Sequence, residues 1–312
     1  MKTTLVTAFV AATFSALNFG VGAAADAFGS GANEFEIEFV TIGNPGNAPD
    51  VTGSPNPAGS VAEIYRIGKF EISEQMIEKA NLVGGLGITK DTRGPDKPAS
   101  NVNWFEAAKF VNWLNADAGS APAYKFDGNG IFQLWQPGDA GYNPANQYRN
   151  GRAKYFLPSA DEWYKAAYYD PATGVFYDYP TGSDSQPDGI DFTGDPDFDA
   201  VFLDPAAGPL PNDITDVGTL SPYGTGGQGG NVFEWEETAF DLVNDSNIAT
   251  RGLRGGGWPD GIGNMRSSTR FGSGPGNDEA YGFRVASVPE PTTWLLAALS
   301  IAGLSVRKRM MG

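Results

Sequence analysis

The sequence predicts a single domain of the α+β class with little regular secondary structure. The 312 residues include 42 Gly and 22 Pro, a composition that favours turns and loops. Two helical segments and two strand-like segments stand out between the Gly-rich connections, and no Pro/Ser-rich linker divides the middle of the chain. With 41% hydrophobic and 12% aromatic residues, the chain has enough apolar side chains to bury a core.

The strand-like segments come first along the chain. Residues 34–42 alternate Phe and Ile with Glu, which is typical of a strand with one buried face. Residues 61–72 predict a second, less regular strand region, because their apolar side chains recur without strict alternation. These two segments supply the β part of the predicted fold.

Two helices are predicted from their N-terminal capping residues. Residues 104–115 follow Asn103, and Glu106 stands three positions later, as in a capping box. A second helix follows Ser159, which has Glu162 at the same spacing. Both helices carry apolar side chains on one face, so we expect them to pack against the core.

Residues 1–25 have the features of a secretory signal peptide. Lys2 is followed by an apolar stretch, and three alanines precede Asp26. The small residues suit cleavage by signal peptidase, whereas a buried N-terminal helix is the alternative. The mature chain is therefore expected to begin at residue 26 and to lie outside the cytoplasm.

Residues 288–312 have three parts in a fixed order. A Pro-Glu-Pro motif is followed by an apolar run over residues 294–306 and then by the basic triplet Arg307-Lys308-Arg309. The run is short for a membrane span, which takes about 20 residues, and basic residues mark the cytoplasmic side. This tail resembles the PEP-CTERM sorting signal, which an exosortase recognises and removes.

The resemblance of the tail has consequences for location. It implies export across the inner membrane of a Gram-negative bacterium, often one that makes exopolysaccharide, with only transient anchoring in the membrane. The expected destination is the cell envelope, the cell surface or the extracellular matrix. An ordinary C-terminal membrane anchor is the alternative, and it also leaves the folded part outside the cytoplasm.

The composition excludes several classes of chemistry. The chain has no Cys and no His, so it offers no disulfide, thiolate nucleophile or imidazole base, and no zinc, copper or haem site of the usual kind. Its net charge is −16, and it becomes −19 without the two end segments, because these contain four of the 21 basic and one of the 37 acidic residues. Such a charge argues against nucleic acid as a partner.

Six blocks between residues 61 and 286 resemble, in order, the formylglycine-generating enzyme family, also called the sulfatase-modifying factor domain. The blocks are Phe70-Glu71-Ile72-Ser73, residues 101–115, residues 155–163, Gly229-Gly230-Asn231-Val232-Phe233-Glu234-Trp235, Arg254-Gly255-Gly256-Gly257-Trp258 and Gly282-Phe283-Arg284-Val285. The resemblance implies a C-type-lectin-like domain over residues 61–287 with long ordered loops. Residues 26–60 would form a strand region before it.

The same resemblance implies that the known activities of the family are absent. Its oxidase members bind copper through two cysteines, and the matching positions here are Ile262 and Ser267. Neither side chain replaces a thiolate as a ligand of copper(I). The sulfoxide synthase relatives hold iron with histidines, which this chain lacks. Ser267 as a nucleophile in its own right needs a neighbouring base, and nothing in the sequence places one there.

The candidate ligand-binding residues are mostly arginines near the C-terminus. They suit an anion-binding pocket, because guanidinium groups pair with carboxylates and sulfates, but salt bridges to the many acidic residues explain them equally well. These candidates are Arg254, Trp258, Arg266, Ser267, Arg270 and Arg284. Three aromatic residues in a Gly/Pro/Asn-rich loop, expected to be exposed, could stack on sugars, although core packing is the commoner role. They are Trp135, Tyr142 and Tyr148.

Calcium is the most plausible ion for this chain, and no copper, iron or zinc is expected. Oxidase members have a calcium site that would correspond here to the backbone of Gly230 and Val232 and the carboxylate of Glu234. Gly227 replaces a side-chain ligand of that site, which leaves too few oxygens unless water fills the gap.

An acidic stretch without Lys or Arg runs from residue 166 to residue 250. It includes Asp191, Asp195, Asp197, Asp199 and Asp204. An EF-hand is excluded, because Ala200 and Ala206 stand where Gly and Glu are required. A solvated acidic loop and a cation-binding loop both stay open.

We therefore expect an exported, non-catalytic binding or structural protein of the cell surface or exopolysaccharide matrix. Exosortase and signal peptidase would process it, and its partner would be exopolysaccharide or a surface protein. The alternative is an oxidoreductase or another enzyme of the family with an unrecognised active site.

Overall fold

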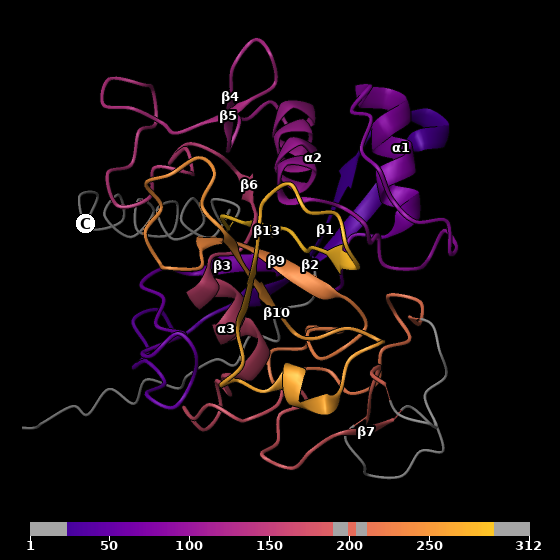
Figure 1. The fold of residues 1–312 in the computed structure, drawn as a ribbon, viewed down its shortest axis with the longest axis vertical. Coiled ribbons are helices and arrows are strands. Elements are labelled where there is room, and N and C mark those ends of the chain that lie inside the picture. The colour runs from indigo at the N-terminus through magenta and orange to yellow at the C-terminus, as the bar shows by residue number, and fades with distance from the viewer. Residues whose placement is uncertain (1–23, 190–198, 204–210, 290–312) are drawn as a thin grey trace, which may run out of the picture.

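The computed structural model describes residues 24–189, 199–203 and 211–289. Within these residues, short strands and three α-helices are joined by long loops (Figure 1). The α+β class with little regular structure is thus confirmed. The predicted signal peptide up to residue 23 and the predicted apolar tail lie outside the described residues, as do Asp191, Asp195, Asp197, Asp204 and Ala206. The described part of the chain has no helix long and apolar enough to span a bilayer.

A five-stranded antiparallel sheet joins the two ends of the described chain. Its order is β1 (Ala24–Phe28), β2 (Phe35–Ile42), β3 (Tyr65–Gly68), β13 (Ala286–Ser287) and β6 (Tyr155–Phe156). The predicted strand at residues 34–42 is confirmed as β2, whereas only the centre of the second predicted region forms β3. Ala24 and Ala25 pair with Phe39 and Glu38 of β2, so the sheet includes the last two residues of the predicted signal peptide.

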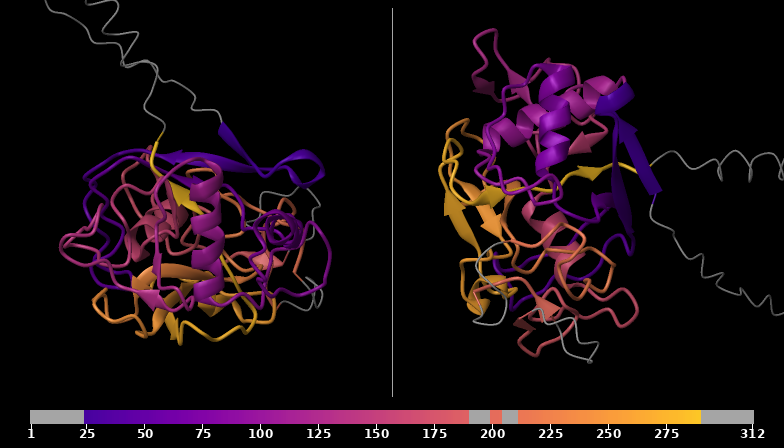
Figure 2. Two further views of the ribbon diagram at one scale, coloured as in Figure 1. Left: turned by 90° about the horizontal axis from the view of Figure 1, so that it is seen from above. Right: turned by 90° about the vertical axis from the view of Figure 1, so that its right-hand side faces the viewer.

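A second, four-stranded sheet lies on the other side of the molecule from β1 and β13 (Figure 2). Its order is β11 (Phe271–Ser273), β10 (Arg251–Arg254), β9 (Phe233–Ala239) and β12 (Tyr281–Gly282), and only β12 pairs in parallel. Two small pairs complete the strands: β4 (Lys125–Phe126) with β5 (Phe132–Gln133), and β7 (Asp188–Gly189) with β8 (Asp199–Ala200). Short 3-10 turns occur at η1 (Gly31–Asn33) and η2 (Ile262–Met265).

Both predicted helices are present with their capping boxes. α2 (Trp104–Asp117) begins after Asn103, and α3 (Ala160–Tyr168) begins after Ser159. A further helix, α1 (Glu74–Gly84), was not predicted, although Ser73 caps its N-terminus and Gly85 ends it with a left-handed φ of 63°. α1 and α2 stand side by side at the top of Figure 1.

One large apolar cluster connects both sheets with α1 and α2. Trp104 and Trp235 lie at its centre, and neither side chain is exposed to solvent. Their indole N–H groups donate to backbone carbonyls of Glu236 and Val102, at 2.9 and 2.8 Å. The buried indoles thus find hydrogen-bond partners, and they fix β9 against the start of α2.

Candidate functional site

Ile262 and Ser267, the positions that the sequence resemblance matches to the enzyme cysteines, lie in a packed region. Ser267 is only 2% exposed. Its amide N–H donates to the carbonyl of Asp178 at 2.8 Å, and its carbonyl accepts from the amide of Ser54 at 3.1 Å. Ile262 is half-buried and packs against a small apolar cluster that contains Met265. Ser267 is therefore almost closed to solvent, whereas Ile262 is partly accessible.

The loop formed by residues 47–60 covers Ser267. Besides the bond from Ser54, the loop is tied down by Asp50, whose carboxylate accepts from the hydroxyl of Tyr164 at 2.5 Å. Burial, together with the Asp50 carboxylate, raises the pKa of Tyr164 well above its usual value. The hydroxyl therefore stays protonated and keeps its hydrogen bond to the loop.

Beside this loop, Glu236 joins two of the candidate arginines. Its side chain is fully buried, and its oxygens accept from Arg254 Nε at 2.6 Å and from Arg270 Nη2 at 2.8 Å. Both arginines thus form salt bridges inside the protein, which is the salt-bridge alternative that the acidic composition allowed. A single carboxylate compensates only one of the two guanidinium charges, and Arg254 Nη2 has no hydrogen-bond partner among the described residues.

The third buried pair joins Arg284 to Glu234. Arg284 contacts both carboxylate oxygens, at 2.5 Å from Nη2 and 2.6 Å from Nε. Trp163 Nε1 also donates to Glu234, at 2.8 Å. All three side chains are inaccessible to solvent. Arg284 therefore has a structural role, because its positive charge compensates the buried carboxylate of Glu234 in β9.

Glu71, which was not predicted as a site residue, extends this group. One carboxyl oxygen accepts from Asn231 at 2.9 Å, while the other has no hydrogen-bond partner among the described residues and lies 4.0 Å from Arg284 Nη2. Burial raises the pKa of Glu71 to about 8, and the nearby Glu234 carboxylate adds to the shift, while Arg284 opposes it. The Glu71 carboxyl group is thus mostly protonated at neutral pH.

The position of Glu71 explains the glycine at position 227. A side chain at Gly227, whose φ is 73°, would overlap the Glu71 carboxyl group. The group that fills this space therefore comes from the N-terminal half of the chain. The sequence contained one signal for it, a lone Glu between Phe70 and Ile72 in the first family block.

A calcium ion at Glu234 would have to displace Arg284 and Trp163, which use both carboxylate oxygens. Glu71 occupies the space next to Gly227, and the described residues include no group of three acidic side chains close enough to hold a metal. As they are placed, these residues do not fit a calcium ion. The calcium site expected at Gly230, Val232 and Glu234 therefore stays a prediction that requires these side chains to rearrange.

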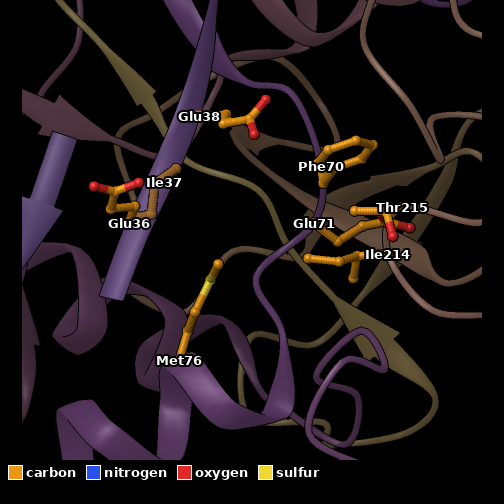
Figure 3. Close-up of a pocket in the computed structure, with 8 residues that line it drawn as sticks. All are labelled: Glu36, Ile37, Glu38, Phe70, Glu71, Met76, Ile214 and Thr215. Atoms are coloured by element: carbon orange, nitrogen blue, oxygen red, sulfur yellow. The ribbon is translucent and has the colours of Figure 1, made fainter. Parts of the chain in front are cut away.

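A cavity of about 130 Å³ lies between β2 and the segment that contains Glu71. Figure 3 shows Glu36 and Glu38 extending from β2, with Phe70 and Glu71 across the cavity. Glu71 lines the cavity, but its carboxyl group points away from Met76 and β2 and lies against Gly227. Lys69 pairs with Glu38 at 3.2 Å. The cavity therefore has no built cation site.

The remaining candidates are separated from one another. Arg266 is exposed and donates from Nε to the hydroxyl of Tyr179 at 2.7 Å. Trp258 lies under the guanidinium of Arg93, 4.2 Å from its ring centroid. The six candidates are thus divided between two buried ion-pair groups, the covered Ser267, and two positions nearer the surface.

One expected surface residue is buried. Tyr148 has no exposed surface and stacks with the guanidinium of Arg251, which lies 4.1 Å from its ring centroid. The expectation that it is exposed was wrong, because an aromatic residue in a polar loop can still be the anchor that holds the loop to the core. Trp135 and Tyr142, from the same loop, are half-buried.

Comparison with known proteins identifies two family models. The sulfatase-modifying factor enzyme 1-like domain matches residues 53–288, and the PEP-CTERM protein-sorting motif matches residues 287–309. No curated protein gives a significant sequence match.

Several solved structures share the fold. Treponema denticola variable protein 1 has a TM-score of 0.58 at 20% identity, covering 85% of this chain and 99% of that one. CarF has a TM-score of 0.57 at 18% identity, with 81% and 99% covered. PvdO from Pseudomonas aeruginosa has a TM-score of 0.53 at 16% identity, with 85% and 98% covered. At these identities the likeness concerns the fold alone.

The family model spans the whole four-stranded sheet, β3, β6 and β13 of the five-stranded sheet, all three helices and both buried ion-pair groups, whereas β1 and β2 precede it. The order of the six sequence blocks and the architecture agree with it. The sorting motif begins at the end of the last strand, β13. This protein therefore belongs to the sulfatase-modifying factor enzyme 1-like family, without the cysteines of its oxidases, and carries a PEP-CTERM signal for export and processing by exosortase.

Proposed function

We propose that the protein is a non-catalytic binding or structural component of the cell surface or exopolysaccharide matrix. Its sorting motif indicates export to the envelope or surface of a Gram-negative bacterium. The proposal adds that the folded domain works there by contact with polysaccharide or another surface molecule, and that signal peptidase releases its N-terminus.

The arrangement around Ser267 carries this proposal. Copper-dependent oxidation needs two thiolates that an incoming peptide and oxygen can reach. Here the two positions hold an aliphatic side chain and a hydroxyl, and Ser267 is 2% exposed beneath residues 47–60. Serine catalysis would need a base within hydrogen-bond reach of the hydroxyl and access for a substrate. The loop removes the access.

The enzyme alternative is tested directly with the purified mature domain. We would incubate it with copper, a reductant and a sulfatase-type cysteine peptide, and detect aldehyde with a hydrazide probe. A family oxidase that retains both cysteines serves as the positive control. The proposal expects no aldehyde above the protein-free blank, and aldehyde formation by this chain would refute it.

The binding function is tested with the producer's own exopolysaccharide. We expect the purified domain to co-sediment with that polymer or with cells that make it, and to stay in solution with cells that do not. Equal recovery from both cell types would contradict a matrix-binding role. Replacing the sorting motif by a stop codon after residue 288 should release the protein into the medium.

A further inference from the structure

Three partly exposed aromatic rings gather on one face of the four-stranded sheet. Phe233, Phe271 and Tyr281 come from β9, β11 and β12. Phe233 lies between the other two, with ring centroids 5.4 Å from Phe271 and 6.3 Å from Tyr281, and meets both edge-to-face, at 85° and 86°. Phe271 is 42% exposed, and the other two rings are half-buried. The three rings form a patch that we call the aromatic patch.

The aromatic patch is held rigidly by the core. Tyr281 pairs with Phe233 in the parallel ladder between β12 and β9. The ring of Tyr281 also packs edge-on against the fully buried Trp235, at 5.1 Å between centroids. Because the patch is built on paired strands and anchored on a core indole, a ligand that binds it has little ordering entropy to overcome.

Two carboxylates border the aromatic patch. Glu279 accepts a hydrogen bond from the hydroxyl of Tyr281 at 2.8 Å. Asp260 accepts a hydrogen bond from the amide of Gly257 at 3.1 Å. Gly257 lies next to both Asp260 and the backbone amide of Phe233, so Asp260 is close to the patch. Burial raises the pKa of Tyr281, and the negative charges of both carboxylates add to this shift. Neither forms an ion pair with Lys or Arg within the described part of the chain.

Uncompensated carboxylates beside aromatic faces favour a cationic ligand. Ring faces attract ammonium groups, and the attraction grows when carboxylates add their charge nearby. Asp260 is half-buried and Glu279 is exposed, so a cationic group on a ligand can approach both carboxylates.

We propose that the aromatic patch, with Asp260 and Glu279, binds an amino sugar of a polysaccharide through its ammonium group. The proposal rests on the proposed matrix-binding function and names the ligand class. The apolar face of a pyranose ring packs on Phe271, the most exposed of the three rings, while the ammonium group lies near the two carboxylates. The Tyr281 hydroxyl can accept from a sugar hydroxyl while it donates to Glu279.

The size of the aromatic patch favours a glycan over a basic protein. A stable protein interface buries roughly 800 Å² on each partner, which three partly exposed rings do not supply. A glycan chain needs only a few stacking rings and hydrogen bonds. The net charge of −16 also attracts a cationic polymer and repels an anionic one.

The place of the aromatic patch in the fold suits an exported protein. The described chain ends beside β13, next to the sorting motif, whereas the sheet with the patch lies on the opposite side of the molecule in both views of Figure 2. While the C-terminus is still held at the membrane, the patch would face away from it. It can therefore meet the matrix before and after processing.

The test is calorimetric titration of the mature domain with defined oligomers. The probes are a glucosamine hexamer, its N-acetylated counterpart, an anionic uronic acid hexamer and a lysine hexapeptide, all at the same ionic strength. We expect the glucosamine hexamer to bind at least about tenfold more tightly than the N-acetylated one. The uronic acid hexamer should show no binding, and the lysine peptide should bind more weakly than the glucosamine hexamer.

Variants assign the binding to the aromatic patch. Phe271→Ala and Glu279→Gln should each weaken glucosamine binding by roughly fivefold to tenfold. The matched control is Phe240→Ala, because Phe240 is similarly exposed, at 45%, but lies over Gly272, whose position in β11 points to the other face. Melting temperatures close to that of the wild type show that the variants fold.

The outcomes separate this inference from the proposed function. Lack of binding to the glucosamine hexamer, or equal affinity for the lysine peptide, would overturn the inference. So would an effect of Phe240→Ala as large as that of Phe271→Ala. If the wild type still co-sediments with the native exopolysaccharide in those cases, the proposed function stands and only the ligand and its site are wrong.

Discussion

Replacing Glu71 with Gln should change how the stability of the protein depends on pH. Glu71 is 1% exposed, and one of its oxygens has no hydrogen-bond partner among the described residues. Burial raises its pKa to about 8 in the folded protein, from an ordinary value of 4.5. The substitution keeps the shape of the side chain and removes its ability to ionise.

The sign of this pH dependence follows from whether the folded or the unfolded protein holds the proton on Glu71. Between pH 4.5 and pH 8, the folded protein keeps a proton on Glu71 that the unfolded chain has already lost. The contribution of Glu71 to stability is therefore fully present below pH 4.5 and is lost as the pH rises through 8. Linkage over this range amounts to roughly 5 kcal/mol of unfolding free energy as an upper bound. The Glu71→Gln variant does not lose this stability as the pH rises, because its side chain cannot ionise.

Urea unfolding between pH 5 and pH 9 measures the effect, followed by the fluorescence of the seven tryptophans. A chelator in all samples removes any bound divalent ion. We expect wild type and Glu71→Gln to have similar stabilities at pH 5, and the variant to be more stable by several kcal/mol at pH 9. Glu38→Gln is the control, because Glu38 is exposed and pairs only with Lys69.

Parallel pH curves for wild type and Glu71→Gln would refute the reasoning. They would mean that Glu71 titrates near its ordinary pKa, so that water or rearranged neighbours solvate its free oxygen. An effect of the same size in Glu38→Gln would equally refute it, since the change would then reflect the total charge of the protein and not the buried site.

Three further predictions concern the rest of the site. Glu236→Gln should destabilise the protein by roughly 3 to 5 kcal/mol, because it leaves two buried arginines without their carboxylate; a urea midpoint within error of the wild type would contradict this. Gly53→Ala should loosen the loop of residues 47–60, because a side chain there overlaps the hydroxyl of Tyr164, whereas Gly43→Ala has free space and serves as the control. Limited proteolysis measures the difference, and equal cleavage rates of the two variants would count against a tightly packed cover. The calcium prediction expects a melting temperature that rises with calcium and falls with chelator, since a ligand of the folded state at 100 times its Kd adds about 2.7 kcal/mol; an unchanged melting temperature would exclude a structural ion.

Local signals in the sequence predicted the elements whose causes are local. Asn103 and Ser159 cap α2 and α3 because each side chain reaches a backbone N–H only three residues away. The alternation of Glu with apolar residues likewise gave β2. The pattern of α1 is weak even though Ser73 and Gly85 cap it, because Ile77 and Ala80 are its only buried apolar side chains.

Local sequence patterns could not predict which residues pair with the buried charges, because the partners are far apart in the sequence. Glu236 and Arg270 are 34 residues apart, and Glu71 and Asn231 are 160 apart. The sequence offered many acids for each arginine, and only the tertiary fold, which brings distant segments together, chooses among them. The same holds for the aromatic patch, which brings together Phe233, Phe271 and Tyr281 from three strands.

The sequence by itself determined the chemistry that this protein lacks and the route by which it is exported. Side chains that are absent cannot be restored by folding, and a sorting motif is read as a linear segment. Only the tertiary structure decided which groups are buried, paired or left free, because burial and charge pairing depend on contacts between distant segments. It placed Ser267 beneath a loop from the N-terminal region, Glu71 in the space beside Gly227, and the carboxylates of Asp260 and Glu279 beside an aromatic surface.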